Sequence, residues 1–287
     1  MDNLILGILA VALITASLWW AARAYRRGLR VARDDHRRRP ALWNRFYAHD
    51  WGATTTNNYG FAPAEGDDPQ RFQHQMYLEM LAQLEARRPL SPGLKLLEVS
   101  CGRGGGLAAF LAKSREMIDA TGLDVAASAV KFCRATYGQR EGLRFIEGSA
   151  LDLPFDAASF DVVLNVEASN DYGDRPRFLS EVARVLKPDG VFLYTDTCRA
   201  GRREELELDM ELAGFAAEFK DITANVVEAC RADTPRRRTV MRSEAPLLAR
   251  LVLGRQLENY AAVEGSKKFA KFESGRRTYL MTAAVKA

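Results

Sequence analysis

The sequence has few residues of the kinds that build metal sites and disulfide frameworks. It contains only three histidines and four cysteines in 287 residues, and no two cysteines form a CxxC pair. Such spacing is typical of neither a zinc site nor a disulfide scaffold, so we expect no metal and a reducing compartment. Cys101 lies inside a glycine-rich turn with no histidine near it in sequence, which favours a small turn residue over a nucleophile.

The sequence also lacks an excess of positive charge over most of its length. Eight of its 41 Lys and Arg and three of its 37 Asp and Glu lie within residues 1–40, so the remaining chain carries 33 basic and 34 acidic residues. Nucleic-acid binding needs a basic face that neutralises phosphates. We therefore expect no nucleic-acid partner, and we interpret the basic runs at 236–238 and 275–277 as solvated faces.

One long apolar run is present, near the beginning of the chain. Residues 4–22 carry no charge, and a helix needs about 20 apolar residues to cross the hydrocarbon core of a bilayer. Trp19 and Trp20 lie near its end, and the eight arginines that follow are expected to stay cytoplasmic. A signal peptide would have positive charge before the run, where only Asp2 stands. A buried core helix would not lead directly into this arginine cluster. We therefore predict a single-pass membrane protein with the rest of the chain in the cytoplasm.

Beyond this run, apolar segments of strand length alternate with amphipathic segments. In residues 175–186, for example, Leu179, Val182 and Val185 recur at helical spacing. This alternation predicts an α/β fold, a Rossmann-like seven-stranded and mostly parallel sheet with helices on both faces. Such sheets bind ligands at the carboxyl ends of their strands. The predicted strands are 94–100, 119–125, 143–150, 160–168, 190–197, 216–224 and 276–287.

These features divide the chain into four parts. Residues 1–24 are the predicted transmembrane anchor and 25–44 a basic juxtamembrane linker. Residues 45–93 form an N-terminal lid segment, and 94–287 form the sheet domain with a second lid insertion at about 224–272. Both lid segments are rich in aromatic residues and leucine, which suits either a cover over a pocket or ordinary packing helices.

A glycine-rich turn follows the first predicted strand, in LLEVSCGRGGGLAAFLA at residues 96–112. Glycine is needed where the backbone approaches a ligand closely or takes a positive φ. Counted from Gly102, the third glycine of a dinucleotide-binding GxGxxG motif would fall at Leu107, and the GK[ST] of a phosphate-binding loop is absent. The alternative is a site for S-adenosylmethionine.

Further motifs stand in the order that this cofactor requires. The first strand contains an acid, Glu98, just before the turn, and the second ends at Asp124, where a carboxylate can accept hydrogen bonds from both ribose hydroxyls. The loop EGSALDLPF at 147–155 is expected beside the adenine, and the fourth strand, FDVVLNVEA, is expected to end facing the methyl group. Each motif alone is weak, but together they occur in the right order and spacing.

From about residue 94 to its end, the chain resembles class I S-adenosylmethionine-dependent methyltransferases. LEVSCGRGGG, TGLD, LPFDAASFDVVLNVEAS and EVARVLKPDG are similar to the phthiotriolone/phenolphthiotriolone dimycocerosates methyltransferases, which O-methylate very apolar lipids. NNYGFAP at 57–63 resembles the segment that lies over the cofactor in sterol and small-molecule methyltransferases. The resemblance implies S-adenosylmethionine as the cofactor. The predicted cofactor-binding residues are Tyr59, Glu98, Ser100, Gly102, Gly104, Asp124, Val125, Ser149, Ala150 and Asn165.

The sequence departs from this family pattern at two positions. Ser149 stands where an acid often meets the adenine amino group, so that contact is expected to be weaker or to come from Asp152. Asn170 stands where the lipid enzymes usually have His. If that His acts as a base in the family, this chain lacks it.

Methyl transfer from a sulfonium asks the protein mainly to hold nucleophile, methyl and sulfur in line, and an aliphatic hydroxyl also needs a base. The predicted catalytic residues are Glu167, Asn170, Asp171 and His49. Glu167 and Asp171 flank the end of the fourth strand, whereas Asn170 can only orient an oxygen. Glu167 equally suits a cap on the next helix, whereas for His49, beside Tyr47 and Trp51, packing in the lid is favoured over catalysis.

These features predict a membrane-anchored methyltransferase that O-methylates a hydroxyl of a lipophilic small molecule, such as a lipid or polyketide. An enzyme held at the bilayer meets apolar molecules there, so the expected partners are this substrate and the bilayer itself, through residues 4–22. A homodimer is left open. The alternatives are C-methylation of a quinone or sterol-like ring, and a scaffold that keeps the fold without turnover.

Overall fold

The computed structural model describes residue 23, residues 35–114 and residues 117–286. The predicted membrane anchor and most of the basic linker therefore lie outside the described residues. Within the described ranges, no helix is long and apolar enough to cross a membrane.

The core of the protein is a single mixed sheet of eight strands within the described residues, in the order β3-β2-β1-β4-β5-β8-β6, with β7 also paired to β8. β1 to β5 run parallel, and β8 is antiparallel to its three partners. The strands are β1 Leu94–Val99, β2 Ile118–Asp124, β3 Leu143–Glu147, β4 Phe160–Val166, β5 Leu186–Arg199, β6 Phe215–Ala216, β7 Lys220–Asp221 and β8 Arg277–Lys286. The predicted Rossmann-like, mostly parallel sheet is confirmed.

The sixth predicted strand is the one that differs. Residues 216–224 form no continuous strand, because the chain pairs with β8 only in the two-residue strands β6 and β7 and then enters a helix at Thr223. The buried side chains of this stretch are Phe215, Phe219 and Ile222. Their spacing of four and three residues does not match the period of two that a half-buried strand requires. The sheet therefore has eight strands where the sequence predicted seven.

Helices cover both faces of the sheet, as predicted. Neighbouring side chains of β1 point to opposite faces, so that Leu96 belongs to one core and Leu97 to the other. The first core is covered by α3 Arg71–Arg87, α4 Gly105–Lys113 and α5 Ala127–Tyr137, and the second by α6 Arg175–Val185 and α7 Arg203–Leu212.

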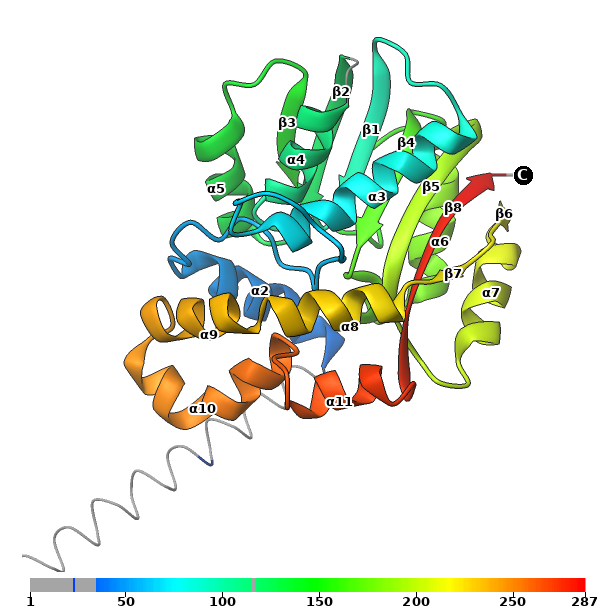
Figure 1. The fold of residues 1–287 in the computed structure, drawn as a ribbon. Coiled ribbons are helices and arrows are strands. Elements are labelled where there is room, and N and C mark those ends of the chain that lie inside the picture. The colour runs from blue at the N-terminus through cyan, green and yellow to red at the C-terminus, as the bar shows by residue number, and fades with distance from the viewer. Residues whose placement is uncertain (1–22, 24–34, 115–116, 287) are drawn as a thin grey trace, which may run out of the picture.

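The remaining helices gather beyond the ends of the parallel strands. Figure 1 shows α2, α8, α9, α10 and α11 below the sheet, at the edge where β1 to β4 end. α2 begins at Arg39, inside the stretch predicted as linker, and four helices occupy the region predicted as the second lid insertion. These helices are α2 Arg39–Ala48, α8 Thr223–Ala232, α9 Thr234–Ser243, α10 Leu247–Tyr260 and α11 Lys267–Glu273.

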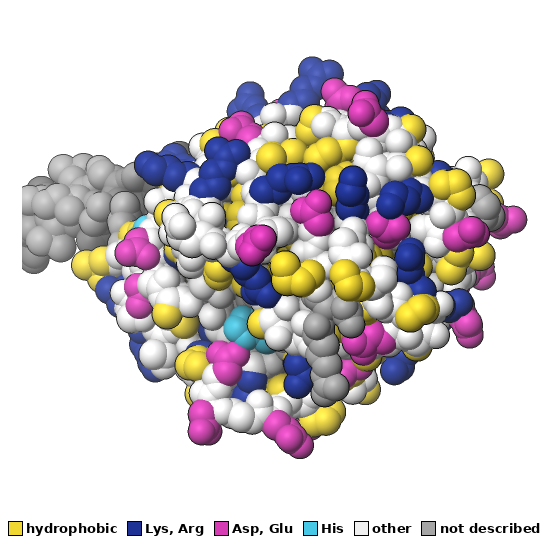
Figure 2. Space-filling model, turned by 90° about the horizontal axis from the view of Figure 1, so that it is seen from above, with side chains coloured by type: hydrophobic (Ala, Val, Ile, Leu, Met, Phe, Trp, Pro, Cys, Tyr) yellow, Lys and Arg dark blue, Asp and Glu magenta, His cyan; other side chains and the backbone are white. Residues whose placement is uncertain are grey.

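Charged side chains of both signs are interspersed on the surface. Figure 2 shows Lys and Arg side chains alternating with Asp and Glu over one face of the described residues. This distribution agrees with the near balance of 33 basic and 34 acidic residues after position 40.

Candidate active site

A cavity of about 170 Å³ lies at the carboxyl ends of the parallel strands. Its floor comes from the loops that follow β1, β2, β3 and β4, and its cover comes from α2 and from residues 55–58. A larger open hollow of about 540 Å³ lies beside Lys95 and Phe160, at the beginnings of β1 and β4. It contains none of the predicted site residues, and ligands of such sheets bind at the other edge, so we assign the candidate site to the smaller cavity.

The turn after β1 brings the backbone to the floor of this cavity. Gly102 and Gly104 have φ of +54° and +74°, conformations that glycine adopts without steric cost. A Cβ on Gly102 would lie 2.8 Å from the Tyr47 hydroxyl. Ser100 takes the position of the first glycine of the usual motif with φ of +63°, and its Oγ accepts a hydrogen bond from the Tyr172 hydroxyl at 2.8 Å.

The next two glycines are required by packing against the N-terminal segment. A Cβ on Gly105 would lie 2.2 Å from Thr55 Oγ1, and a Cβ on Gly106 would lie 2.0 Å from the ring of Tyr77. The Tyr77 hydroxyl in turn donates to Glu98 Oε1 at 2.7 Å. These glycines therefore let the first lid segment and α3 approach the start of α4.

Two buried acids lie beneath the turn. Asp124 accepts hydrogen bonds from the N–H groups of Gly102 at 2.9 Å and Ala126 at 2.8 Å, and burial raises the pKa of this carboxyl. Burial also raises the pKa of Glu98 to about 8. Glu98 Oε2 is buried and has no hydrogen-bond partner among the described residues.

This arrangement fits S-adenosylmethionine, which offers hydroxyl and ammonium donors. A carboxylate below the turn accepts such donors, and the bare backbone at Gly102 allows a ligand to approach closely. Six of the ten predicted cofactor residues line the cavity, namely Ser100, Gly102, Asp124, Val125, Ser149 and Ala150.

The other four predicted cofactor residues lie outside the lining. Glu98 is buried near the end of β1, and Gly104 is a buried residue of the turn itself. Asn165 donates to the Val99 carbonyl at 2.9 Å and to the Tyr172 hydroxyl at 2.7 Å, so it positions Tyr172. Tyr59 directs its N–H to Glu167.

Glu167 follows the end of β4 and contributes to the cavity wall. Its φ is +52°, a conformation that costs a residue with a side chain on the order of 1–3 kcal/mol and that clusters at functional sites. Its Oε1 accepts hydrogen bonds from the Tyr59 N–H at 2.6 Å and from the Tyr279 hydroxyl. Burial raises the pKa of Glu167 to about 7, although both hydrogen bonds lower it. Glu167 does not cap the following helix, because Asp174 caps α6.

The three other predicted catalytic residues are placed differently from one another. Asp171 lines the cavity and forms an ion pair with Arg39 at 3.0 Å. Asn170 lies outside the lining, where its side-chain amide donates to Asp196 Oδ1 at 2.7 Å. His49 also lies outside the lining and contacts the Glu244 carbonyl at 2.6 Å, which joins the end of α2 to the end of α9.

Several lining residues were missed from the sequence, above all Trp43 and Tyr47 of α2. Their rings stack with centroids 5.8 Å apart, and burial beside Asp124 raises the pKa of Tyr47. The spacing of four residues between two aromatic side chains was the available signal, since such residues share a helix face. Residue 43 lies within the range 25–44 that was predicted as a basic linker. The other missed lining residues include His36, Arg39, Thr55, Thr56, Asn57, Asn58, Tyr77, Arg103 and Tyr172.

Comparisons with known proteins agree with this geometry. Residues 97–194 match a family model described as a methyltransferase domain. The chain is 34% identical over 221 residues to the phthiotriol/phenolphthiotriol dimycocerosates methyltransferase of Mycobacterium leprae, which covers 77% of this chain and 78% of that protein. It is 44% identical over 137 residues to the fatty-acid O-methyltransferase of Mycolicibacterium smegmatis, covering 48% of this chain and 47% of that one. A geranyl diphosphate methyltransferase solved in complex with SAM shares the fold, with a TM-score of 0.63 at 17% identity over 82% of this chain and 100% of that chain.

The packing of Gly106 gives a testable prediction. Gly106→Ala places a Cβ where the Tyr77 ring lies, so we expect a loss of about 1–3 kcal/mol in the free energy of unfolding, measured by urea denaturation. Gly254→Ala is the matched control, because nothing lies within 4 Å of the Cβ it would add on α10, and we expect it to stabilise by about 0.5–1 kcal/mol. Equal stability of the two variants would contradict the close packing at Gly106.

Proposed function

The chain belongs to the S-adenosylmethionine-dependent methyltransferases, in the family of the phthiotriol/phenolphthiotriol dimycocerosates methyltransferases, and from this premise we propose that it O-methylates a hydroxyl of a lipophilic small molecule. Glu167 carries the proposal. It is a half-buried carboxylate in the cavity wall, and its partial removal from water raises its pKa to about 7. A hydroxyl acceptor needs such a base to take its proton, whereas a carboxyl acceptor that is already ionised has no proton to remove.

The residues beneath the cavity are proposed to hold the cofactor. Asp124 would accept hydrogen bonds from the ribose hydroxyls, and Glu98 Oε2 would gain a partner in the cationic amino acid part. The loop of Ser149 and Ala150, together with Val125, would lie beside the adenine. When bound, S-adenosylmethionine supplies a methyl group activated by the positive charge on its sulfur.

Glu167 is proposed to take the proton of the acceptor hydroxyl as its oxygen attacks. The acceptor oxygen would gain the methyl group that the bound sulfonium gives up, and the proton that this oxygen loses would move to Glu167. A carboxylate of pKa near 7 is partly ionised at neutral pH and is a stronger base than one of ordinary pKa. The aromatic side chains of Trp43, Tyr47 and Tyr172 around the cavity would exclude water.

A lipophilic acceptor is supported by two observations. The relatives named above act, by their names, on phthiotriol or phenolphthiotriol dimycocerosates and on fatty acids, which are lipids. The uncharged run at residues 4–22 and the arginines after it suit a single-pass anchor with the catalytic domain in the cytoplasm. The proposal therefore includes an enzyme that takes its acceptor from the bilayer, with residues 45–93 and 224–272 as lid segments.

The acceptor atom can be identified by label transfer. Full-length protein would be incubated with methyl-labelled S-adenosylmethionine and a membrane-lipid extract, with the aqueous extract as the comparison. We expect label in the lipid fraction, with the carbon shift of a methoxy group. A C-methyl shift would favour methylation of a ring carbon, and cofactor binding without any product would favour a scaffold.

Loss of the Glu167 carboxylate tests the proposed base. Glu167→Gln should lower kcat/KM about 10²- to 10⁴-fold while the affinity for S-adenosylmethionine stays near that of the wild type. Because the base must be ionised, kcat/KM of the wild type should rise about tenfold per pH unit below pH 7 and level off above it. Glu141→Gln is the control, since Glu141 is an exposed carboxylate in the turn before β3, at the opposite end of that strand from the cavity. A flat pH profile would instead point to a carboxyl acceptor.

Asp124 gives a separate test of the cofactor site. Asp124→Ala should weaken S-adenosylmethionine binding by about 2–4 kcal/mol, since hydrogen bonds to a charged group contribute about 1.5–3 kcal/mol each. Isothermal titration calorimetry measures this loss. Asp119→Ala, on the same strand but paired with Arg144 on the surface, should change binding by no more than about 0.5 kcal/mol. Equal affinities for the two variants would mean that Asp124 does not bind the ribose.

A further inference from the structure

Tyr59 is held through both ends of its backbone. Its N–H donates to Glu167 Oε1 at 2.6 Å, and its carbonyl accepts a hydrogen bond from Arg237 Nη2 at 2.6 Å. The N–H that orients the candidate base Glu167 therefore belongs to Tyr59, which lies in an irregular segment. The position of Tyr59 depends on the side chain of Arg237 from α9.

Arg237 is a buried cation, and each of its three guanidinium nitrogens donates at least one hydrogen bond. Its side chain is 6% exposed. Nε donates to Asp233 Oδ2 at 3.0 Å, and Nη1 donates to the Ala261 carbonyl and contacts Cys230 Sγ at 3.3 Å. The planar fork of arginine suits such divergent acceptors, and the compact ammonium of lysine does not. Arg237 thus joins the Tyr59 segment to α8 and to the end of α10.

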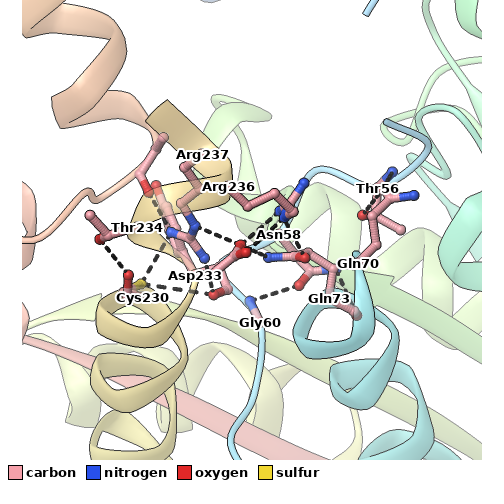
Figure 3. Close-up of polar contacts among 12 residues, drawn as sticks. Thr56, Asn58, Gly60, Gln70, Gln73, Cys230, Asp233, Thr234, Arg236 and Arg237 are labelled. Carbon is pink, nitrogen blue, oxygen red and sulfur yellow. Dashed lines mark hydrogen bonds and ion pairs between the residues drawn. The ribbon is translucent and has the colours of Figure 1, made fainter. Parts of the chain in front are cut away.

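Asp233 connects this cation to the rest of the fold. It is 3% exposed and also accepts hydrogen bonds from Gln73 Nε2 at 2.8 Å and from Arg236 Nε at 2.7 Å. Figure 3 shows these side chains meeting between α8, α3 and the irregular segment that carries Gly60. The network therefore fixes Arg237 relative to α3, which packs directly on the core of the sheet.

Stability alone does not account for such a network. A buried ion pair contributes little net stability, because desolvation of the charges offsets their attraction, and apolar replacements are often neutral or stabilising. An apolar pair in place of Arg237 and Asp233 would not provide a hydrogen-bond donor to the Tyr59 carbonyl.

We infer that Arg237 is a positioning residue for methyl transfer: by holding the Tyr59 carbonyl it directs the Tyr59 N–H to Glu167 and fixes the orientation of that carboxylate in the cavity wall. This role rests on the proposed function of Glu167 as the base. Arg237 itself is not among the residues that line the cavity.

The other groups that face Glu167 are not themselves substituted in Arg237→Lys, and lysine keeps the positive charge at position 237. They come from the Tyr59 segment, α8, α10, α11, β5 and β8, and they are Tyr59, Cys230, Tyr260, Lys268, Asp196 and Tyr279. A change in the titration of Glu167 in Arg237→Lys would therefore report the loss of the Tyr59 N–H hydrogen bond, which favours the charged carboxylate.

The test compares pH profiles of kcat/KM in the full-length wild type and Arg237→Lys. We expect the apparent pKa of the acidic limb to rise by about one unit, so that kcat/KM falls about tenfold at pH 6 and approaches the wild-type value at high pH. Arg236→Lys is the matched control, because Arg236 shares Asp233 but has no contact with Tyr59. Its apparent pKa should equal that of the wild type. Thermal unfolding and S-adenosylmethionine binding confirm that each variant is folded.

A second variant covers the case in which Arg237→Lys does not fold. Asn58 holds the same segment from its other side, through the Gln73 carbonyl at 3.2 Å and the Gly60 N–H at 2.8 Å. Asn58→Ala should shift the same apparent pKa upward. If the wild type shows the acidic limb but the folded variants show no shift in its apparent pKa, the role of Arg237 is overturned while the role of Glu167 stands. A wild type without the limb would overturn the role of Glu167 and, with it, this inference.

Discussion

The hydrogen bond between the Tyr59 N–H and the Glu167 carboxylate joins the two halves of the site. Glu167 directly follows β4 of the sheet, whereas Tyr59 lies in the segment that comes before the sheet in the chain. A buried carboxylate is unfavourable unless it is hydrogen-bonded. The ionised form of Glu167 therefore depends on the N-terminal segment being in place, with Tyr279 of β8 as the second donor.

The glycine-rich turn has a similar double role. Its first two glycines adopt the left-handed conformations that bring the backbone to the cavity floor, and the next two leave room for Thr55 and the Tyr77 ring. Tyr77 in turn meets Glu98 beneath the turn. One short run of glycines thus forms the candidate cofactor floor and also receives the segment that covers it.

Most of the sheet could be predicted because its signals are local. Strands β1 to β5 and β8 are apolar runs bounded by turns, and parallel packing between layers of helices follows from their alternation with helical segments. The predicted strand at 216–224 was wrong because β6 and β7 each pair with β8 through only two residues, and such short strands leave little pattern in the sequence. α2 was missed because the arginine-rich stretch that leads into it was interpreted as a linker as far as residue 44. The helix itself is mostly apolar, and its packing over the cavity explains those apolar side chains.

By itself, the sequence determined the fold class, the glycine turn and the acids at the ends of the strands, because these depend on spacing along one strand or turn. Only the tertiary structure decided how the side chains near β4 are used. Asn170 and Asp171 are adjacent in sequence, yet one binds Asp196 away from the cavity and the other lines it. The N–H of Tyr59 donates to Glu167, and its carbonyl accepts a hydrogen bond from Arg237, 178 residues later. Contacts between segments so far apart depend on how helices pack across the sheet, and no local pattern encodes them.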